Sequence, residues 1–220
     1  MIEKSLTAEL PSLSAPTATG PAPRAGNAGE PDDAAVIERS WHEPDGFAVI
    51  FSRHAPTIAR YLARRVGPQI AEDIVAETFL QAFRSRHRYD LSRRDARPWL
   101  YGIATNLAGR HRRTEARQLR ALERTGVDPV VESFADRAEA RVAAGGALRG
   151  LAGALARLRP VYRDALLLVA WADLSYEEAA TALGVPVGTI RSRVSRARSA
   201  LRTALGGVDP IALIEETVHE

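Results

Sequence analysis

The sequence of 220 residues contains no cysteine, which excludes a disulfide framework, a cysteine-ligated zinc site and a catalytic thiol. The same absence fits a reducing compartment. No apolar run approaches the roughly 20 residues that cross a bilayer, and Met1 to Leu10 lacks the apolar core of a signal peptide. We therefore expect a cytoplasmic protein without membrane insertion.

Lysine is almost absent too, because Lys4 is the only one, and arginine supplies nearly all of the positive charge. Arginine suits bidentate contacts to phosphate groups and base edges. A GC-rich genome, whose codons favour arginine and alanine, produces the same excess whatever the function. The arginine content alone therefore leaves both interpretations open.

The sequence also lacks the patterns of common enzymes. It contains no glycine-rich phosphate loop of the Walker type. His54, His87 and His111 are scattered, and no His-Glu pair or carboxylate cluster has catalytic spacing. We expect no catalytic residue, no metal site and no cofactor. An enzyme that acts on nucleic acid is an alternative, which a nuclease assay with divalent metals would detect.

Helical periodicity without any clear strand pattern predicts an all-α protein of two small domains. Residues 1–40 are rich in Pro, Ala, Gly, Ser and Thr, a composition that buries too little apolar surface to offset its ordering entropy. Gly126, Pro129 and the Gly145-Gly146 pair interrupt the region between the domains. The predicted organisation is a disordered extension (1–40), a helical domain (41–116), a flexible linker (117–146), a second helical domain (147–207) and a C-terminal tail (208–220).

In the first domain, apolar spacing after Phe47 predicts one amphipathic helix, or two separated at Pro56. Gly67-Pro68 is a break. A helix is expected over about 69–86, then a polar loop over about 89–97, and Pro98 suits the first residue of a third helix.

The second domain carries a clear helix-turn-helix pattern. Ser175 and Glu178 form a capping box, Gly184 suits a left-handed helix end, and Val185-Pro186 suits a tight turn. The next helix has an apolar stripe (Val187, Ile190, Val194, Ala197 and Leu201) and a basic face without acidic residues (Arg191, Ser192, Arg193, Ser195, Arg196, Arg198 and Arg202). This order of elements is typical of a recognition helix in a major groove. The alternative is an amphipathic helix whose arginines are only solvated. Two upstream helices are expected to form core beneath it, through Leu151, Leu155, Leu158, Tyr162, Leu166 and Val169.

The first domain offers two candidate binding surfaces, an acidic helix face and a polar side of the third helix. Asp73, Glu77 and Gln81 share one helix face at i, i+4 and i+8, where a basic partner or plain solvation accounts for them. In the third helix an apolar stripe (Trp99, Ile103 and Leu107) is expected opposite a polar side (Gly102, Asn106, Arg110 and Arg113). Aromatic, amide and arginine groups together suit single-stranded DNA, although Trp99 also suits the core.

The segments 71–79, 99–106, 174–180 and 188–193, in this order, resemble the extracytoplasmic-function (ECF) sigma factors of the sigma-70 family over about residues 46–205. The resemblance implies that the first domain is sigma region 2 and the second is sigma region 4. It further implies core RNA polymerase, promoter DNA and an anti-sigma factor as partners.

The resemblance assigns roles to three sets of residues. The first would dock on the clamp coiled coil of the polymerase β′ subunit: Asp73, Glu77 and Gln81. The second would recognise the −10 element: Asp95, Arg97, Asn106, Arg110 and Arg113. The third would read the −35 element while the domain lies on the β flap: Arg191, Ser192, Arg193, Ser195, Arg196 and Arg198. A stand-alone helix-turn-helix regulator is the alternative, and it would dimerise on a palindrome.

Overall fold

The computed structural model describes residues 31–124 and 146–207, which form two groups of helices with no strand among them. The first group comprises α1 (Asp33–Arg39), α2 (Ala48–Val66), α3 (Pro68–Ser85) and α4 (Arg97–Arg124), with short 3-10 turns at Pro44–Phe47 and Arg86–Arg88. The second comprises α6 (Gly146–Arg157), α7 (Pro160–Ala170), α8 (Tyr176–Leu183) and α9 (Val187–Ala204). The prediction of an all-α, two-part chain is confirmed. Residues 1–30, most of the linker and the tail lie outside the described residues.

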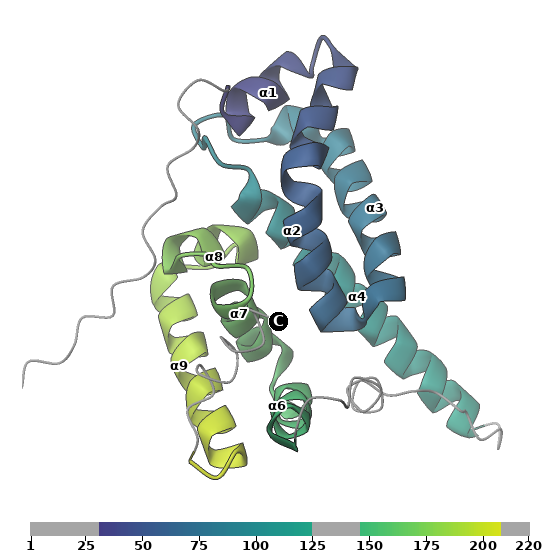
Figure 1. Cartoon of the computed structure of the whole chain (residues 1–220), viewed down its shortest axis with the longest axis vertical. Coiled ribbons are helices and arrows are strands. Elements are labelled where there is room, and N and C mark those ends of the chain that lie inside the picture. The colour runs from purple at the N-terminus through teal and green to yellow at the C-terminus, as the bar shows by residue number, and fades with distance from the viewer. Residues whose placement is uncertain (1–30, 125–145, 208–220) are drawn as a thin grey trace, which may run out of the picture.

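The first group is built on a hairpin of α2 and α3, which lie side by side with α4 packed against both (Figure 1). Gly67 forms the turn of the hairpin at φ +87°, a backbone conformation that glycine adopts without steric cost. Pro68 follows as the first residue of α3, where its missing N–H has no helical partner to lose. The predicted break at these two residues is confirmed.

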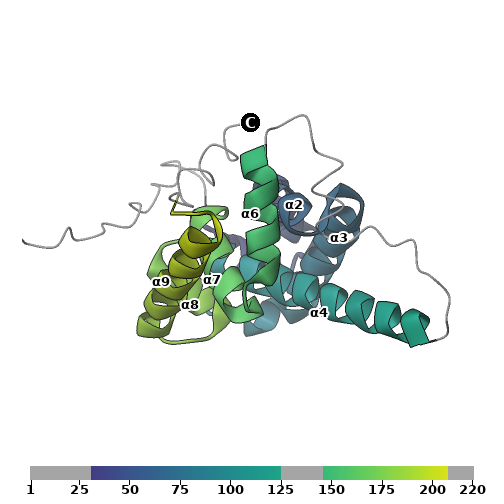
Figure 2. The same ribbon diagram turned by 90° about the horizontal axis from the view of Figure 1, so that it is seen from below.

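Two predicted domain boundaries were wrong, and one open alternative is decided. The expected disordered extension to residue 40 overlaps α1, whose Val36 and Ile37 are fully buried. Of the two alternatives after Phe47 the single helix is confirmed: Pro56 does not divide α2, because it lies on the exposed side and the carbonyl that loses its donor can bind water. The linker begins later than residue 117, since α4 continues to Arg124 through residues of high helix propensity. In Figure 2 this C-terminal part of α4 extends away from the other helices.

The buried side of α4 also differs from the predicted stripe. Leu100, Ala104 and Ala108 are fully buried, whereas Trp99 and Leu107 are only partly buried. The supposed polar side is not fully exposed either, since Gly102 is buried. The reason is that α4 is covered on two sides, by α2 and α3 on one and by the second group of helices on the other. Because the predicted pattern assumes that only one face of α4 is buried, it places the centre of the buried stripe wrongly.

The helix-turn-helix prediction is confirmed, although Val187 of the predicted stripe is only partly buried. The Ser175 hydroxyl accepts from the Glu178 N–H (3.1 Å), and the Glu178 carboxylate accepts from the Ser175 N–H (2.7 Å). Gly184 ends α8 at φ +63°, and α9 begins at Val187. Ile190, Val194, Ala197 and Leu201 bury one stripe of α9 against α7, with Leu151, Leu155, Leu158 and Leu166 beneath them. Tyr162 and Val169, also expected in this core, are only partly buried.

Loss of this cap should destabilise the helix-turn-helix. We expect Ser175→Ala to lower the free energy of unfolding by about 1 kcal/mol, because an N–H of the first turn of α8 loses its acceptor. Ser199→Ala, an exposed site on α9, is the matched control and should change it by less than about 0.5 kcal/mol. Urea unfolding followed by circular dichroism measures both values, and equal values would contradict the capping role.

Candidate DNA-binding and docking surfaces

The exposed face of α9 has short side chains at its centre and arginines on both edges. At about 100° of rotation per residue, the exposed residues Ser192, Ser195 and Ser199 lie opposite the buried stripe. Arg193 and Arg196 lie on one edge, and the other edge carries Arg191, Arg198 and Arg202. A narrow polar ridge between two basic edges suits a groove whose floor is bases and whose walls are phosphates.

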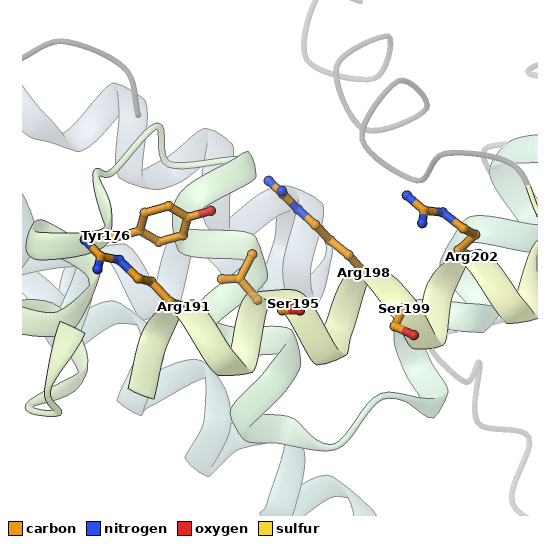
Figure 3. Close-up of a pocket in the computed structure, with 7 residues that line it drawn as sticks. Tyr176, Arg191, Ser195, Arg198, Ser199 and Arg202 are labelled. Atoms are coloured by element: carbon orange, nitrogen blue, oxygen red, sulfur yellow. The ribbon is translucent and has the colours of Figure 1, made fainter. Parts of the chain in front are cut away.

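One basic edge of α9 borders an open hollow of about 590 Å³ against α8 (Figure 3). Its lining is Tyr176, Arg191, Val194, Ser195, Arg198, Ser199 and Arg202. Figure 3 shows Arg198 and Arg202 extended toward the same side of α9, with Tyr176 near Arg191. The buried Nε of Arg198 has no hydrogen-bond partner among the described residues. Three guanidinium groups and three hydroxyl groups line the hollow, and this excess of positive charge favours an anion.

Two residues of the predicted −35 set already have partners outside α9. Arg191 lies 3.6 Å from the Glu177 carboxylate of α8. The sequence predicted a basic face without acidic residues, but α8 places an acidic neighbour beside it. Arg196 donates to the Tyr162 hydroxyl of α7 (3.3 Å), and this hydrogen bond lowers the pKa of Tyr162. The side chains of Arg191 and Glu177 are both more than half exposed, so a phosphate can displace the Glu177 carboxylate at little cost in free energy.

The predicted −10 residues fall into two sets. Asp95 and Arg97 lie together where the 89–96 loop meets α4, and the Asp95 carboxylate accepts from both the N–H and the Nε of Arg97 (2.8 Å each). Asn106, Arg110 and Arg113 are exposed farther along α4. The second set is open to a ligand, whereas in the first set the Arg97 side chain is mostly covered and the Asp95 side chain is 44% exposed.

Helix α8 covers Arg97 of the first set. Arg97 forms a second ion pair with Glu178 (3.2 Å), and Arg93 of the loop donates to the Thr181 hydroxyl (2.9 Å). One turn along α4, a Cβ on Gly102 would lie 2.5 Å from the carbonyl oxygen of Ala182. The two helices therefore touch backbone to backbone, and only glycine permits this approach. Figure 1 shows α8 beside the N-terminal end of α4.

A buried ion pair joins the two groups of helices farther along. Arg65 of α2 is 2% exposed and donates to Asp164 of α7 (2.5 Å) and to the Tyr61 hydroxyl (2.6 Å). That hydroxyl is also hydrogen-bonded to Thr105 of α4 (3.0 Å). Residues from α2, α4 and α7 thus form one network, so breaking any member leaves a buried polar group unsatisfied.

This junction, defined as Arg65, Arg112, Arg163 and Asp164, holds more positive than negative charge. Burial and the nearby charges of Arg112 and Arg65 lower the pKa of Arg163 to about 10. Burial and the charge of Arg65 likewise lower the pKa of Arg112, although the charges of Asp164 and Glu115 act in the opposite direction. Across the contact, Arg163 of α7 is therefore repelled by Arg65 and Arg112 and attracted by its neighbour Asp164.

The acidic face of α3 is exposed as predicted, at Asp73, Glu77 and Gln81. The structure adds Leu80, which is 41% exposed and lies on the same face, one turn from Glu77. Phe51 of α2 is 48% exposed and packs edge-on against Phe79, with ring centroids 4.9 Å apart. Acidic groups beside exposed apolar ones suit a protein partner with the opposite charge.

Sequence reasoning missed Leu80, Asp33, Arg65 and Asp164. The spacing of Leu80 from Asp73 and Glu77 (i+7 and i+3) was a usable signal. No sequence signal links Arg65 to Asp164 or Asp33 to the 89–96 loop, because each contact joins segments far apart in the chain.

Comparison with known proteins places this architecture in a family. The model for sigma-70 region 2 matches residues 50–118, and the model for sigma-70 region 4 matches residues 148–201. RNA polymerase sigma factor CarQ of Myxococcus xanthus is 33% identical over 177 residues, which cover 75% of this chain and 92% of CarQ. ECF RNA polymerase sigma factor SigC of Mycobacterium tuberculosis is 38% identical over 137 residues, covering 60% of this chain and 68% of SigC. The chain belongs to the ECF group of the sigma-70 family.

The fold of this sigma factor agrees with that assignment. A solved structure of the sigma factor RpoE of Bartonella quintana, in complex with the anti-sigma factor NepR, matches with a TM-score of 0.54 and 25% identity. The match covers 73% of this chain and 96% of that one. Members of the family are transcription initiation factors and not catalysts. Within residues 31–124 and 146–207, no helix has the length and hydropathy of a membrane span, and no group of three acidic or histidine side chains is arranged around a metal position.

The contact between regions 2 and 4 should depend on Gly102. We expect Gly102→Ala to separate α8 from α4, because its methyl group would overlap a backbone oxygen of α8. Gly109→Ala on the same helix is the control, since its methyl group would meet only the end of a flexible side chain at 3.7 Å. The chain has no cysteine, so spin labels at Arg60→Cys and Thr203→Cys report the distance between regions 2 and 4. Identical distance distributions in both variants would contradict the prediction.

Proposed function

We propose that this sigma factor docks on core RNA polymerase through α3, reads the −35 element with α9 and recognises the −10 element with the start of α4 and the loop before it. One observation carries the proposal: a basic helix-turn-helix and an exposed acidic-apolar helix face occur in the same chain. A stand-alone regulator needs the first surface and has no use for the second. Run-off transcription with core polymerase and a genomic library, followed by sequencing of the start sites, tests the proposal.

The docking surface consists of Asp73, Glu77, Gln81 and Leu80. Like charges one helical turn apart cost helix stability, so a basic partner that neutralises them gains affinity. The exposed leucine at the edge of the face adds apolar area that is buried only on binding. The clamp coiled coil of the β′ subunit is the partner that the family assigns to this face.

The −35 surface is α9, with region 4 resting on the β flap. Its serine ridge permits close approach to the groove floor, while the arginine edges reach the phosphates on either side. The α8–α9 hollow, which Arg191, Arg198 and Arg202 line, supplies one of these phosphate sites. Such contacts make the affinity depend steeply on salt concentration.

Recognition of the −10 element requires regions 2 and 4 to separate. In the closed arrangement Arg97 binds Glu178, and α8 covers the adjoining turn of α4. A flipped base reaches this end of α4 only after α8 has moved. The repulsion among Arg65, Arg112 and Arg163 lowers the free energy needed for that movement. Docking of the two regions on separate sites of the polymerase then holds them apart.

Strand opening is proposed to proceed by capture of single-stranded bases. Unstacking a base costs a few kcal/mol, and stacking on protein groups returns roughly 1–3 kcal/mol per base. Phosphate contacts from the arginines supply the remainder. This role needs no catalysis by the sigma factor and takes place in the cytoplasm with the polymerase. An anti-sigma partner is proposed to control it, and the solved complex of RpoE with the anti-sigma factor NepR supports such a partner.

Charge reversal on α3 should abolish polymerase binding. We expect Asp73→Arg with Glu77→Arg to lose co-purification with core polymerase while the melting temperature changes little, because both side chains are exposed. The control reverses two exposed charges elsewhere, Glu38→Arg with Glu43→Arg, and should bind normally. Retention of holoenzyme by the α3 variant would remove the docking assignment.

Substitution in α9 should weaken −35 recognition selectively. We expect Arg191→Ala or Arg196→Ala to reduce promoter affinity by roughly 1–3 kcal/mol if the side chain contacts a base. Arg157→Ala, an exposed arginine on α6, is the control and should have no effect on promoter choice. The measurement is holoenzyme binding to promoters with intact and scrambled −35 elements. An unchanged preference in both α9 variants would refute base reading by these arginines.

A further inference from the structure

Asp33, in the first turn of α1, is 7% exposed and contacts a segment more than 60 residues away in the chain. Its Oδ2 accepts from the backbone N–H of Ala96 (2.9 Å), and its own backbone N–H donates to the carbonyl of Arg94 (3.0 Å). Both partners belong to the 89–96 loop, which precedes α4. One residue of α1 therefore fixes two backbone positions of this loop.

The carboxylate of Asp33 is held in place from α2. Oδ2 also accepts from the His54 Nε2 (2.7 Å), and Oδ1 accepts from the Arg53 Nη1 (3.1 Å). Burial alone would raise the pKa of Asp33, but the hydrogen bonds from His54, Ala96 and Arg53 outweigh it and leave the pKa below its usual value. The group is therefore a charged acceptor with three donors aimed at it, and its geometry is fixed on every side.

At its end nearest α4, the backbone of the 89–96 loop is held by Asp33. Tyr89 donates its hydroxyl to the Arg93 carbonyl (2.7 Å), and Asp90 accepts from Ser92 (2.7 Å). Those bonds are local, within four residues of the chain. The side chains of Arg93 and Arg94 reach farther, to Thr181 (2.9 Å) and to Asp32 (3.6 Å). Among the described residues, both long-range hydrogen bonds to the backbone of residues 94–96 come from Asp33.

Attachment of α1 itself does not depend on these bonds. Val36 and Ile37 are fully buried and anchor the helix, and the preceding residue, Asp32, caps it by accepting from the Ala35 N–H (2.9 Å). The carboxylate of Asp33 is thus directed at the loop and α2 and not at the end of its own helix. Its position one turn before the hydrophobic anchor makes it a clip between α1 and the loop.

We propose that Asp33 is a positioning residue for −10 recognition, which holds residues 94–96, and through them Asp95 and Arg97, in the geometry that receives a flipped base. The inference rests on the proposed function for its consequence, but the clip itself is a property of the isolated chain. Because the loop is already held in place, less conformational entropy is lost when the base is captured, and the free energy of binding is more favourable.

The first test measures the clip without polymerase. Asp33→Asn keeps the size of the side chain but replaces one carboxylate oxygen by an NH₂ group. Because Ala96, His54 and Arg53 all donate to this side chain, the NH₂ group faces a donor and one hydrogen bond is lost. We expect amide hydrogen exchange at Ala96 to quicken by about tenfold, as for one lost charged hydrogen bond. Glu38→Gln, which makes the same carboxylate-to-amide change at an exposed position of α1, is the matched control and should leave the exchange unchanged. Unchanged exchange at Ala96 in Asp33→Asn would overturn the proposal.

The second test measures recognition. With holoenzyme and a fork-junction DNA that carries the −10 element of a promoter found by run-off sequencing, we expect Asp33→Asn to bind about tenfold more weakly. Its affinity for core polymerase and for a duplex −35 element should equal that of wild type. An equal loss in all three measurements would mean a merely structural role and would overturn the proposal. If wild type itself ignores the polymerase, the proposed function fails, whereas the exchange result stands.

A further variant covers the case in which Asp33→Asn melts below the assay temperature. Asp33→Glu keeps the charge for His54 and Arg53 but moves the carboxylate by one methylene group. Because position and not charge is then altered, we expect the same selective loss on the −10 fork. Wild-type binding by Asp33→Glu would contradict a positioning role.

Discussion

The backbone contact between α4 and α8 is the constraint on which the arrangement of the whole molecule depends. It exists because Gly102 has no side chain, so the Ala182 carbonyl approaches to a distance that a Cβ would forbid. Two ion pairs hold the regions together on either side of this contact. One joins Arg97 to Glu178, and the other is the buried pair of Arg65 and Asp164. The same contact covers the end of α4 that is proposed to read the −10 element.

Opposing electrostatic effects keep this contact from being permanent. The ion pairs favour the closed arrangement, while the charges of Arg65 and Arg112 lower the pKa of Arg163 across the contact and so oppose it. Like charges held close together repel one another, so another surface that competes for either region favours opening. The polymerase and the promoter both offer such surfaces.

Local patterns were sufficient where one element decides its own structure. The capping box at Ser175, the left-handed end at Gly184 and the buried stripe of α9 follow from interactions within a few residues, and the structure confirms all three. The helix at 33–39 was missed because its stability comes from tertiary burial of Val36 and Ile37 and from Asp33, whereas composition averages it with its proline-rich neighbours. The extension of α4 to Arg124 was missed because mixed charge resembles a linker although the residues favour helix.

The sequence by itself determined the all-α class, the two regions, the helix-turn-helix and the acidic face of α3, because periodicity and capping are encoded at spacings of three to eight residues. Only the tertiary structure decided which proposed DNA-binding residues are open and which are covered. Arg97 and Glu178, or Asp33 and Ala96, are more than 60 positions apart, and no short-range pattern specifies such a pair. Their contact results from how whole helices pack, and packing depends on the shapes of both surfaces at once.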